Sequence, residues 1–174
     1  EEKLNRSSML YGLCFFVFII IALIFITIQA NNFNDFSKTE FNIVGSGGDF
    51  TEGNNGMGRD LCKMILASLK KDKVGVDRYY QESLKYQGRM ESSLKDIQKV
   101  NNSKYSEAIA KAINEQKEIK SLMTQMYELS EAGRTDEAWE LYEKRYNVIA
   151  TSMRNDMDKV MTETDKVAAE YAQN

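Results

Sequence analysis

Residues 9–28 read MLYGLCFFVFIIIALIFITI, and the rest of the chain is best interpreted outward from this stretch. A helix of these 20 residues is about 30 Å long, which matches the hydrocarbon core of a bilayer. No charged residue occurs between Arg6 and Asp35. The pattern predicts a transmembrane helix over residues 9–30.

A cleaved signal peptide is the alternative for this stretch. The apolar region of a signal peptide is normally only ~7–15 residues long and ends at a site of small residues. The apolar run here is longer, and Ile28, Gln29 and Ala30 match a cleavage site poorly. The sequence therefore favours an uncleaved anchor.

Basic residues indicate the orientation of this anchor. Lys3 and Arg6 precede the span, whereas the first charged residue after it is Asp35. Because basic residues are enriched on the cytoplasmic side, we expect residues 1–8 to form a cytoplasmic N-terminal stub. Residues 31–174 then lie outside the cytoplasm, and the chain is expected in the inner (cytoplasmic) membrane with a single span.

Apolar residues after the anchor recur at steps of three and four, the spacing of one helix face, in four segments: 57–71, 76–99, 103–130 and 135–171. Gly133 supplies the left-handed residue that ends the third segment, and Asn101, Asn102 and Ser103 mark the break before it. Each apolar face has to be buried, and the connections are short. We therefore expect an all-α fold, in which the N-terminal transmembrane helix is followed by an elongated antiparallel four-helix bundle. The longest apolar face comprises Tyr142, Tyr146, Ile149, Met153, Met157, Val160, Thr164, Val167 and Tyr171.

Residues 45–58 do not fit this pattern, because they hold six glycines in fourteen positions. Such a run predicts a loop. It lacks the Gly-Lys-Ser/Thr ending of a phosphate-binding loop. Phe33, Phe36, Ile43 and Val44 continue the apolar pattern beyond the anchor, so we expect the first bundle helix to be interrupted by a glycine-rich loop over residues 45–58.

The composition excludes several classes of function. The chain has no histidine, so a catalytic triad and an imidazole-ligated metal site are excluded. Cys14 and Cys62 are too far apart in sequence for a Cys-x-x-Cys pair. A net charge of −3 gives no basic footprint for nucleic acid. We expect no enzymatic activity, no cofactor, no metal and no nucleic-acid partner.

The hairpin between the last two segments carries the clearest likeness to a known family. Residues 129–139, LSEAGRTDEAW, resemble the turn of methyl-accepting chemotaxis proteins, in which a glycine and a short polar step precede an acidic pair and an alanine. A second likeness is the helix start at Gly58, Arg59 and Asp60, followed by DRYY at residues 77–80. Nearly the whole chain resembles the first transmembrane helix and four-helix-bundle sensor domain of these bacterial chemoreceptors.

Two features depart from the family pattern. The glycine-rich run lies where the first helix of the family is usually continuous with its anchor. The chain also ends at Asn174 while the last helix is still predicted to run. A chemoreceptor would continue into a second span, a HAMP linker and a cytoplasmic coiled coil, so we interpret the chain as a sensor domain truncated before a second transmembrane helix.

The resemblance implies a ligand site and partners. Family ligands bind between the first and last helices near the dimer interface, and a carboxylate ligand needs the planar donor fork of an arginine. By that likeness Arg59, Arg145 and Arg154 are the expected ligand-binding residues. The expected partners are a second copy of the chain, the membrane, and either an amino acid or organic acid or a small binding protein.

Two alternatives share the same helical pattern. The sensor module is equally compatible with a histidine kinase or a cyclic-dinucleotide enzyme as its output. A membrane-anchored structural bundle without a ligand is also compatible with the pattern, since no sequence motif marks a pocket.

Overall fold

The structure is a computed structural model that describes the backbone of residues 2–100 and 105–173, and the side chains of residues 11, 15–100 and 105–169. Every regular element in these ranges is a helix, which confirms the predicted all-α class. Expectations that rest on the side chains of Lys3, Arg6, Cys14 or Tyr171, or on the break at 101–103, lie outside the described residues.

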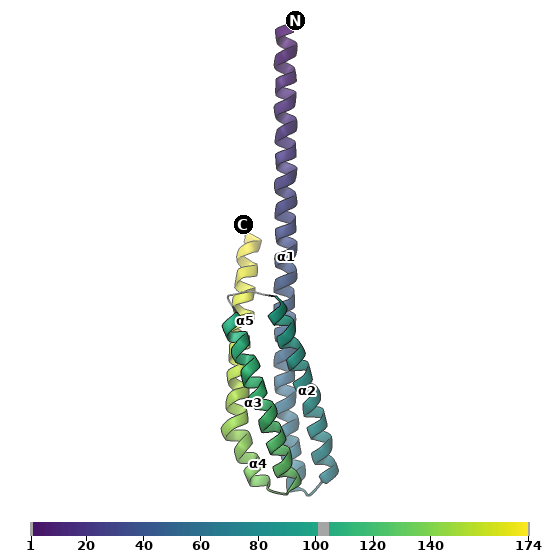
Figure 1. Cartoon of the computed structure of the whole chain (residues 1–174), viewed down its shortest axis with the longest axis vertical. Coiled ribbons are helices and arrows are strands. Elements are labelled where there is room, and N and C mark those ends of the chain that lie inside the picture. Colours follow the sequence, from purple (N-terminus) through teal and green to yellow (C-terminus); the bar gives the residue numbers. More distant parts are fainter. Residues whose placement is uncertain (1, 101–104, 174) are drawn as a thin grey trace. The chain divides into compact units, whose positions relative to one another are not determined.

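The helices follow one another with short connections (Figure 1). They are α1 (Glu2–Leu69), α2 (Lys73–Lys99), α3 (Ser106–Glu131), α4 (Thr135–Leu141), the π-helical turn η1 (Tyr142–Tyr146) and α5 (Asn147–Gln173). The chain divides into two units, Glu1–Thr39 and Glu40–Asn174. The boundary between the two units falls inside α1.

The first unit is the N-terminal part of α1. Among the described residues, α1 is the one helix that is long and apolar enough to cross a membrane, and none of its apolar window is buried. Phe15, Phe18 and Phe25 each expose more than half of their surface. An apolar surface of this kind is unfavourable in water and favourable in lipid.

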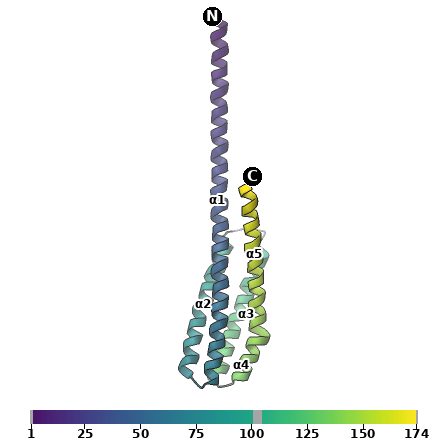
Figure 2. The same cartoon turned by 180° about the vertical axis from the view of Figure 1, so that it is seen from behind.

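The second unit buries one apolar core. The C-terminal half of α1, α2, α3 and the α4–η1–α5 segment lie side by side in both views (Figures 1 and 2). The apolar faces expected from the helical spacing are buried over most of their length, since Met57, Leu94 and Met157 are at most 2% exposed. Leu69, a position expected on the first face, is instead 65% exposed at the C-terminal end of α1. Gln116, the polar residue within the third stripe, is buried as well. The other expected positions in the core are Leu61, Met64, Ile65, Val76, Met90, Ile97, Tyr105, Ile109, Ala112, Ile119, Met123, Met126, Tyr146, Met153 and Val160.

The expectation of a loop over residues 45–58 is wrong, because α1 runs through this range without interruption. A β-carbon built at Gly53 would lie 2.8 Å from Met90 Cγ and 3.2 Å from the Tyr86 carbonyl oxygen of α2. A β-carbon at Gly47 would lie 2.6 Å from Met161 of α5. Gly47 and Gly53 therefore let α1 approach its neighbours closely, and the packing around them overrides the weak helix propensity of about 1 kcal/mol per glycine.

The same continuity corrects two further expectations. The predicted helix start at Gly58, Arg59 and Asp60 is an interior position of α1. The predicted helix over residues 135–171 contains η1, a π-helical turn in which the backbone hydrogen bonds span five residues instead of four. In contrast, Gly133 has φ +72°, as expected for the residue that ends α3.

Candidate functional site

A small polar cavity lies between α1 and the η1–α5 segment, and its volume is about 110 Å³. On one side α1 contributes Asn54 and Gly58, and on the other η1 contributes Tyr146 and α5 contributes Arg154. The remaining lining residues are Asn55, Arg59, Tyr142, Asn147 and Ala150. We call this space the polar cavity.

Three buried polar atoms of the polar cavity have no hydrogen-bond partner among the described residues. They are Asn54 Oδ1, Tyr146 Oη and Arg154 Nε. Asn54 itself is held in place, because its Nδ2 donates to the Ala150 carbonyl oxygen at 2.7 Å. Leaving a buried donor or acceptor unpaired costs about 1–3 kcal/mol, and groups of this kind are normally satisfied by protein, water or ligand. Each of the three atoms therefore has hydrogen-bonding capacity that the described residues leave unused.

The π-helical turn positions the tyrosines at this cavity. The rings of Trp139, Tyr142 and Tyr146 form a stacked series, with centroids 5.5 Å and 5.1 Å apart. A β-carbon at Gly58 would lie 3.3 Å from Tyr146 Oη and 3.5 Å from Tyr142 Oη. Both hydroxyls thus reach α1 at a position without a side chain. Single π-helical turns inside α-helices occur frequently at functional sites.

Burial determines the protonation of the two tyrosines. Loss of hydration raises the pKa of Tyr146, and neighbouring Tyr142 raises it further, while the Arg154 cation opposes the shift. Burial also raises the pKa of Tyr142, with a second contribution from the Cys62 thiol. Both phenols are neutral near pH 7, so Tyr146 Oη can donate a hydrogen bond as well as accept one.

The structure brings together two of the three expected arginines. Arg59 and Arg154 both line the polar cavity. Arg145 does not line it, and its Nη2 instead donates to Glu118 Oε1 of α3 at 2.6 Å on the exposed surface. A ligand in the polar cavity would contact Arg154, whose side chain forms part of the cavity wall.

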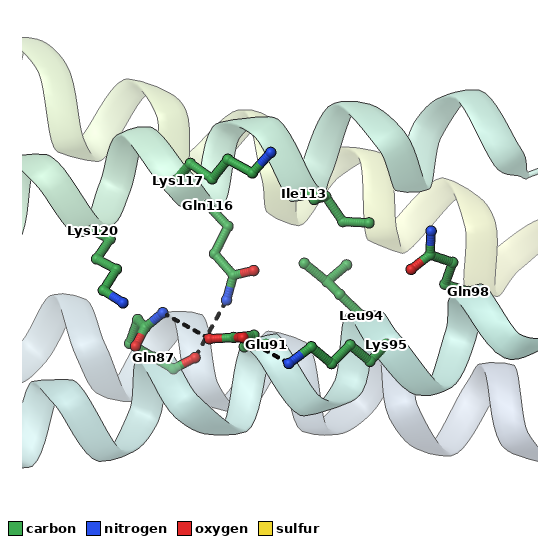
Figure 3. Close-up of a pocket in the computed structure, with 9 residues that line it drawn as sticks. All are labelled: Gln87, Glu91, Leu94, Lys95, Gln98, Ile113, Gln116, Lys117 and Lys120. Carbon is green, nitrogen blue, oxygen red and sulfur yellow. Dashed lines mark hydrogen bonds and ion pairs between the residues drawn. The ribbon is translucent and has the colours of Figure 1, made fainter.

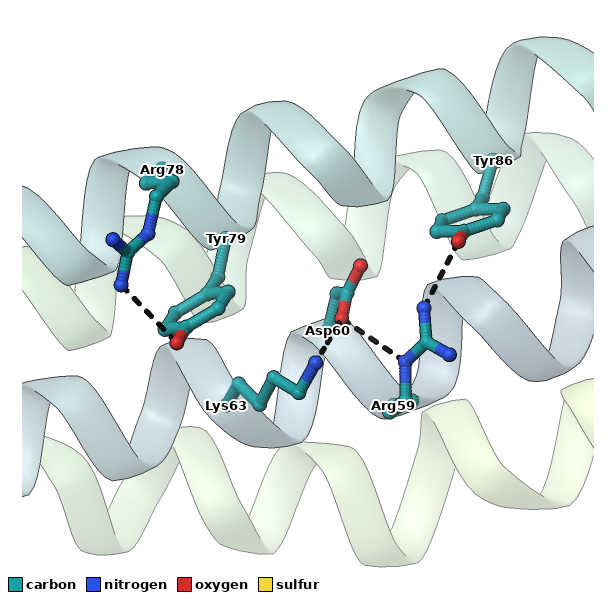
Figure 4. Close-up of polar contacts among 6 residues, drawn as sticks. All are labelled: Arg59, Asp60, Lys63, Arg78, Tyr79 and Tyr86. Atoms are coloured by element: carbon teal, nitrogen blue, oxygen red, sulfur yellow. Dashed lines mark hydrogen bonds and ion pairs between the residues drawn. The ribbon is translucent and has the colours of Figure 1, made fainter.

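Arg59 extends from the cavity toward α2 (Figure 4). Its Nη2 donates to Tyr86 Oη at 2.9 Å, and its Nε donates to Asp60 Oδ1 at 3.2 Å. Lys63 Nζ reaches the same carboxylate oxygen at 3.0 Å, so the buried Asp60 has two cationic partners. These hydrogen bonds engage the Nε and Nη2 donors of the Arg59 guanidinium. Arg59 therefore lies at the rim of the cavity with only part of its donors free.

Sequence reasoning missed the uncharged residues of the site. The sequence pattern places Asn54 in an expected loop and Tyr146 on an apolar helix face, so it singles out neither residue. Once residues 45–58 are treated as helical, Asn54 and Gly58 lie four residues apart on one face, which is the signal that identifies them. Within residues 2–100 and 105–173, no group of three or more histidine, cysteine or acidic side chains is arranged to hold a metal ion.

Comparison with family models, curated proteins and solved structures found no match to the chain.

Proposed function

We propose that the chain is the sensing part of a transmembrane receptor of the chemoreceptor type. In this proposal residues 9–30 cross the inner membrane with the N-terminus in the cytoplasm. Residues 31–174 lie outside the cytoplasm, and their helices form an elongated antiparallel four-helix bundle. The chain binds a ligand and does not catalyse a reaction.

The unpartnered polar atoms of the polar cavity carry the proposal. A bundle that serves only as a tether gains nothing from burying Asn54 Oδ1, Tyr146 Oη and Arg154 Nε without hydrogen-bond partners among the described residues, since apolar side chains would pack there more favourably. Such atoms are expected where a polar molecule completes the hydrogen bonds. This observation favours a sensor over the structural alternative.

The chemistry of the cavity limits the ligand. Arg154 Nε is a donor and suits a carboxylate oxygen, whereas Asn54 Oδ1 is an acceptor and needs an N–H or O–H group. An amino acid or a hydroxylated organic acid carries both. A volume of about 110 Å³ admits the polar end of such a molecule, with any longer side chain directed past Arg59 at the rim.

The position of the cavity suggests how occupancy is signalled. A bound molecule contacts α1 through Asn54 and α5 through Arg154, so it favours the relative placement of these helices that satisfies both. A ligand signals only through a difference in its affinity for two states. In a homodimer the favoured state would be passed through the membrane to an output region, either a chemotaxis signalling domain or an enzyme such as a histidine kinase.

The test is ligand binding to the full chain in detergent, followed by thermal unfolding with a panel of L-amino acids and small organic acids. At a concentration of 100 times the Kd, a ligand stabilises by about 2.7 kcal/mol, or roughly 5–10 °C in Tm. The proposal requires that at least one compound produces a shift of this kind. If no compound on the panel shifts Tm, the proposal fails.

Tyr146→Phe separates a binding role from a structural one. Removing an unpartnered hydroxyl is expected to leave Tm without ligand unchanged or raised, while the shift produced by the ligand shrinks. Arg154→Gln is expected to abolish the shift. Arg145→Gln is the matched control and should respond as the wild type does, because Arg145 lies outside the cavity. Equal responses of all three variants would contradict the assignment of the site.

A further inference from the structure

A second and larger cavity lies in the groove between α2 and α3 (Figure 3), and its volume is about 250 Å³. We call it the α2–α3 groove. It shares no lining residue with the polar cavity. Its lining residues are Gln87, Glu91, Leu94, Lys95, Gln98, Ile113, Gln116, Lys117 and Lys120.

Positive charge exceeds negative charge in the α2–α3 groove. Three lysines line it against one carboxylate, Glu91. That carboxylate is already occupied, because Lys95 Nζ lies 2.8 Å from Glu91 Oε1 and Gln87 Nε2 lies 3.5 Å from Glu91 Oε2. The hydrogen bond from Lys95 lowers the pKa of Glu91, and the charge of Lys120 contributes, so Glu91 is ionised near neutral pH.

Lys117 and Lys120 remain without a carboxylate partner among the described residues. Lys117 Nζ donates a hydrogen bond to the neutral amide oxygen Asn114 Oδ1 at 3.5 Å. Several other lysines of the described helices pair with an acidic residue, such as Lys85 with Glu82 and Lys144 with Glu140, both at 2.6 Å. Two like charges one helical turn apart repel each other. An anion between Lys117 and Lys120 would relieve this repulsion.

The floor of the α2–α3 groove combines amide and apolar groups. Gln87 and Gln116 are 7% and 6% exposed, and Gln116 Nε2 donates to the Gln87 carbonyl oxygen at 3.3 Å. Leu94 and Ile113 supply apolar surface beside these amides (Figure 3). The volume is below the roughly 300–1,000 Å³ typical of sites for drug-sized ligands, so the groove suits a compact metabolite.

We propose that the α2–α3 groove binds a small organic polyanion with two or more carboxylate groups. Carboxylates pair with Lys117 and Lys120, the glutamine amides donate to the remaining oxygens, and the carbon chain lies on Leu94 and Ile113. This site is additional to the polar cavity and does not depend on it. It gives the bundle a second binding place, which requires at least two carboxylates on one ligand.

The test is isothermal titration of the full chain in detergent with citrate as the probe, at constant ionic strength set with sodium chloride. The proposal predicts saturable binding near one molecule per chain. Lys117→Gln combined with Lys120→Gln is expected to weaken citrate affinity at least tenfold. Lys70→Gln with Lys73→Gln is the matched control, since it removes the same charge from exposed lysines outside the groove and should retain affinity.

The outcomes separate this site from its alternatives. Equal loss in both double variants would show attraction by net charge and would overturn the proposal, as would unchanged affinity in the Lys117/Lys120 variant. Inorganic phosphate binding as tightly as citrate would overturn the choice of a carboxylate ligand. Arg154→Gln should leave citrate binding intact. In the protein labelled with ¹⁵N-glutamine, citrate should shift the side-chain signals of Gln87 and Gln116 but not that of Gln125, which lies outside the groove.

Discussion

Replacing Gly56 by alanine tests whether residues 45–58 are a packed helix. A β-carbon at Gly56 would lie 2.5 Å from Tyr86 Cε1 and 2.6 Å from Cδ1 and Cζ of the same ring. The ring cannot move aside freely, because Arg59 donates to its hydroxyl at 2.9 Å and its guanidinium carbon lies 5.6 Å from the ring centroid. Gly48 has open space at the same position and is the matched control.

Both substitutions gain stability from helix propensity, but only Gly56→Ala loses stability through overpacking. Alanine in place of a glycine inside a helix contributes about 1 kcal/mol of stability through helix propensity and reduced freedom of the unfolded chain. Gly48→Ala should gain this amount. Gly56→Ala gains it too but loses about 1–3 kcal/mol to overpacking. The difference between the variants is therefore the overpacking term, which corresponds to roughly 2–12 °C in Tm.

Thermal unfolding of the full chain in detergent, followed by far-ultraviolet circular dichroism, measures this difference. Gly48→Ala is expected to melt above the wild type, with Gly56→Ala melting below Gly48→Ala. A loop over residues 45–58 predicts no such order, because alanine at either position would then act through local backbone conformation alone. If Gly56→Ala melted as high as Gly48→Ala, the close packing of α1 on α2 would be refuted.

Three further predictions use the same thermal assay. Gly133→Ala should lower stability by about 1–2 kcal/mol, because φ at this position is +72°, and an unchanged Tm would contradict the left-handed helix end. Asp72→Ala should cost about 1 kcal/mol by removing the 2.9 Å hydrogen bond from the Gly75 N–H at the start of α2, whereas Asp165→Ala, at an exposed position, should not lower Tm. Above pH 10, the free energy of unfolding should fall as pH rises, because burial raises the pKa of Tyr146 and the unfolded chain loses this proton first. Tyr146→Phe should reduce that slope, and an identical slope would exclude Tyr146 as its source.

The apolar pattern was sufficient to predict the helices because the spacing of buried residues along a helix depends only on local geometry. The stripes through Met57, Leu94 and Met157 are buried as expected. The glycine-rich run was mispredicted for the opposite reason, since its helical state depends on α2 and α5. Propensity is a weak prior, and tertiary contacts at Gly47, Gly53 and Gly56 override it.

The candidate site was predictable only in part. Arginine is the residue type that suits a carboxylate, and this reasoning selected Arg59 and Arg154, which line the polar cavity. It could not separate them from Arg145, because the partner of Arg145, Glu118, lies on a different helix. Nor could it find Asn54, whose unpaired oxygen becomes visible only when the packing of α1 on α5 is known.

The glycine-rich run and the polar cavity are two aspects of one feature of α1. A helix with ordinary side chains at Gly53 and Gly56 would be held away from α2, and one at Gly58 would push against the hydroxyls of Tyr146 and Tyr142. Glycine at these positions brings α1 close to both neighbours while leaving polar space beside Asn54. Ordinary side chains along this run would remove both the close contacts with α2 and the polar space beside α5, so the composition that resembles a loop is better explained as a requirement of the packing around the polar cavity.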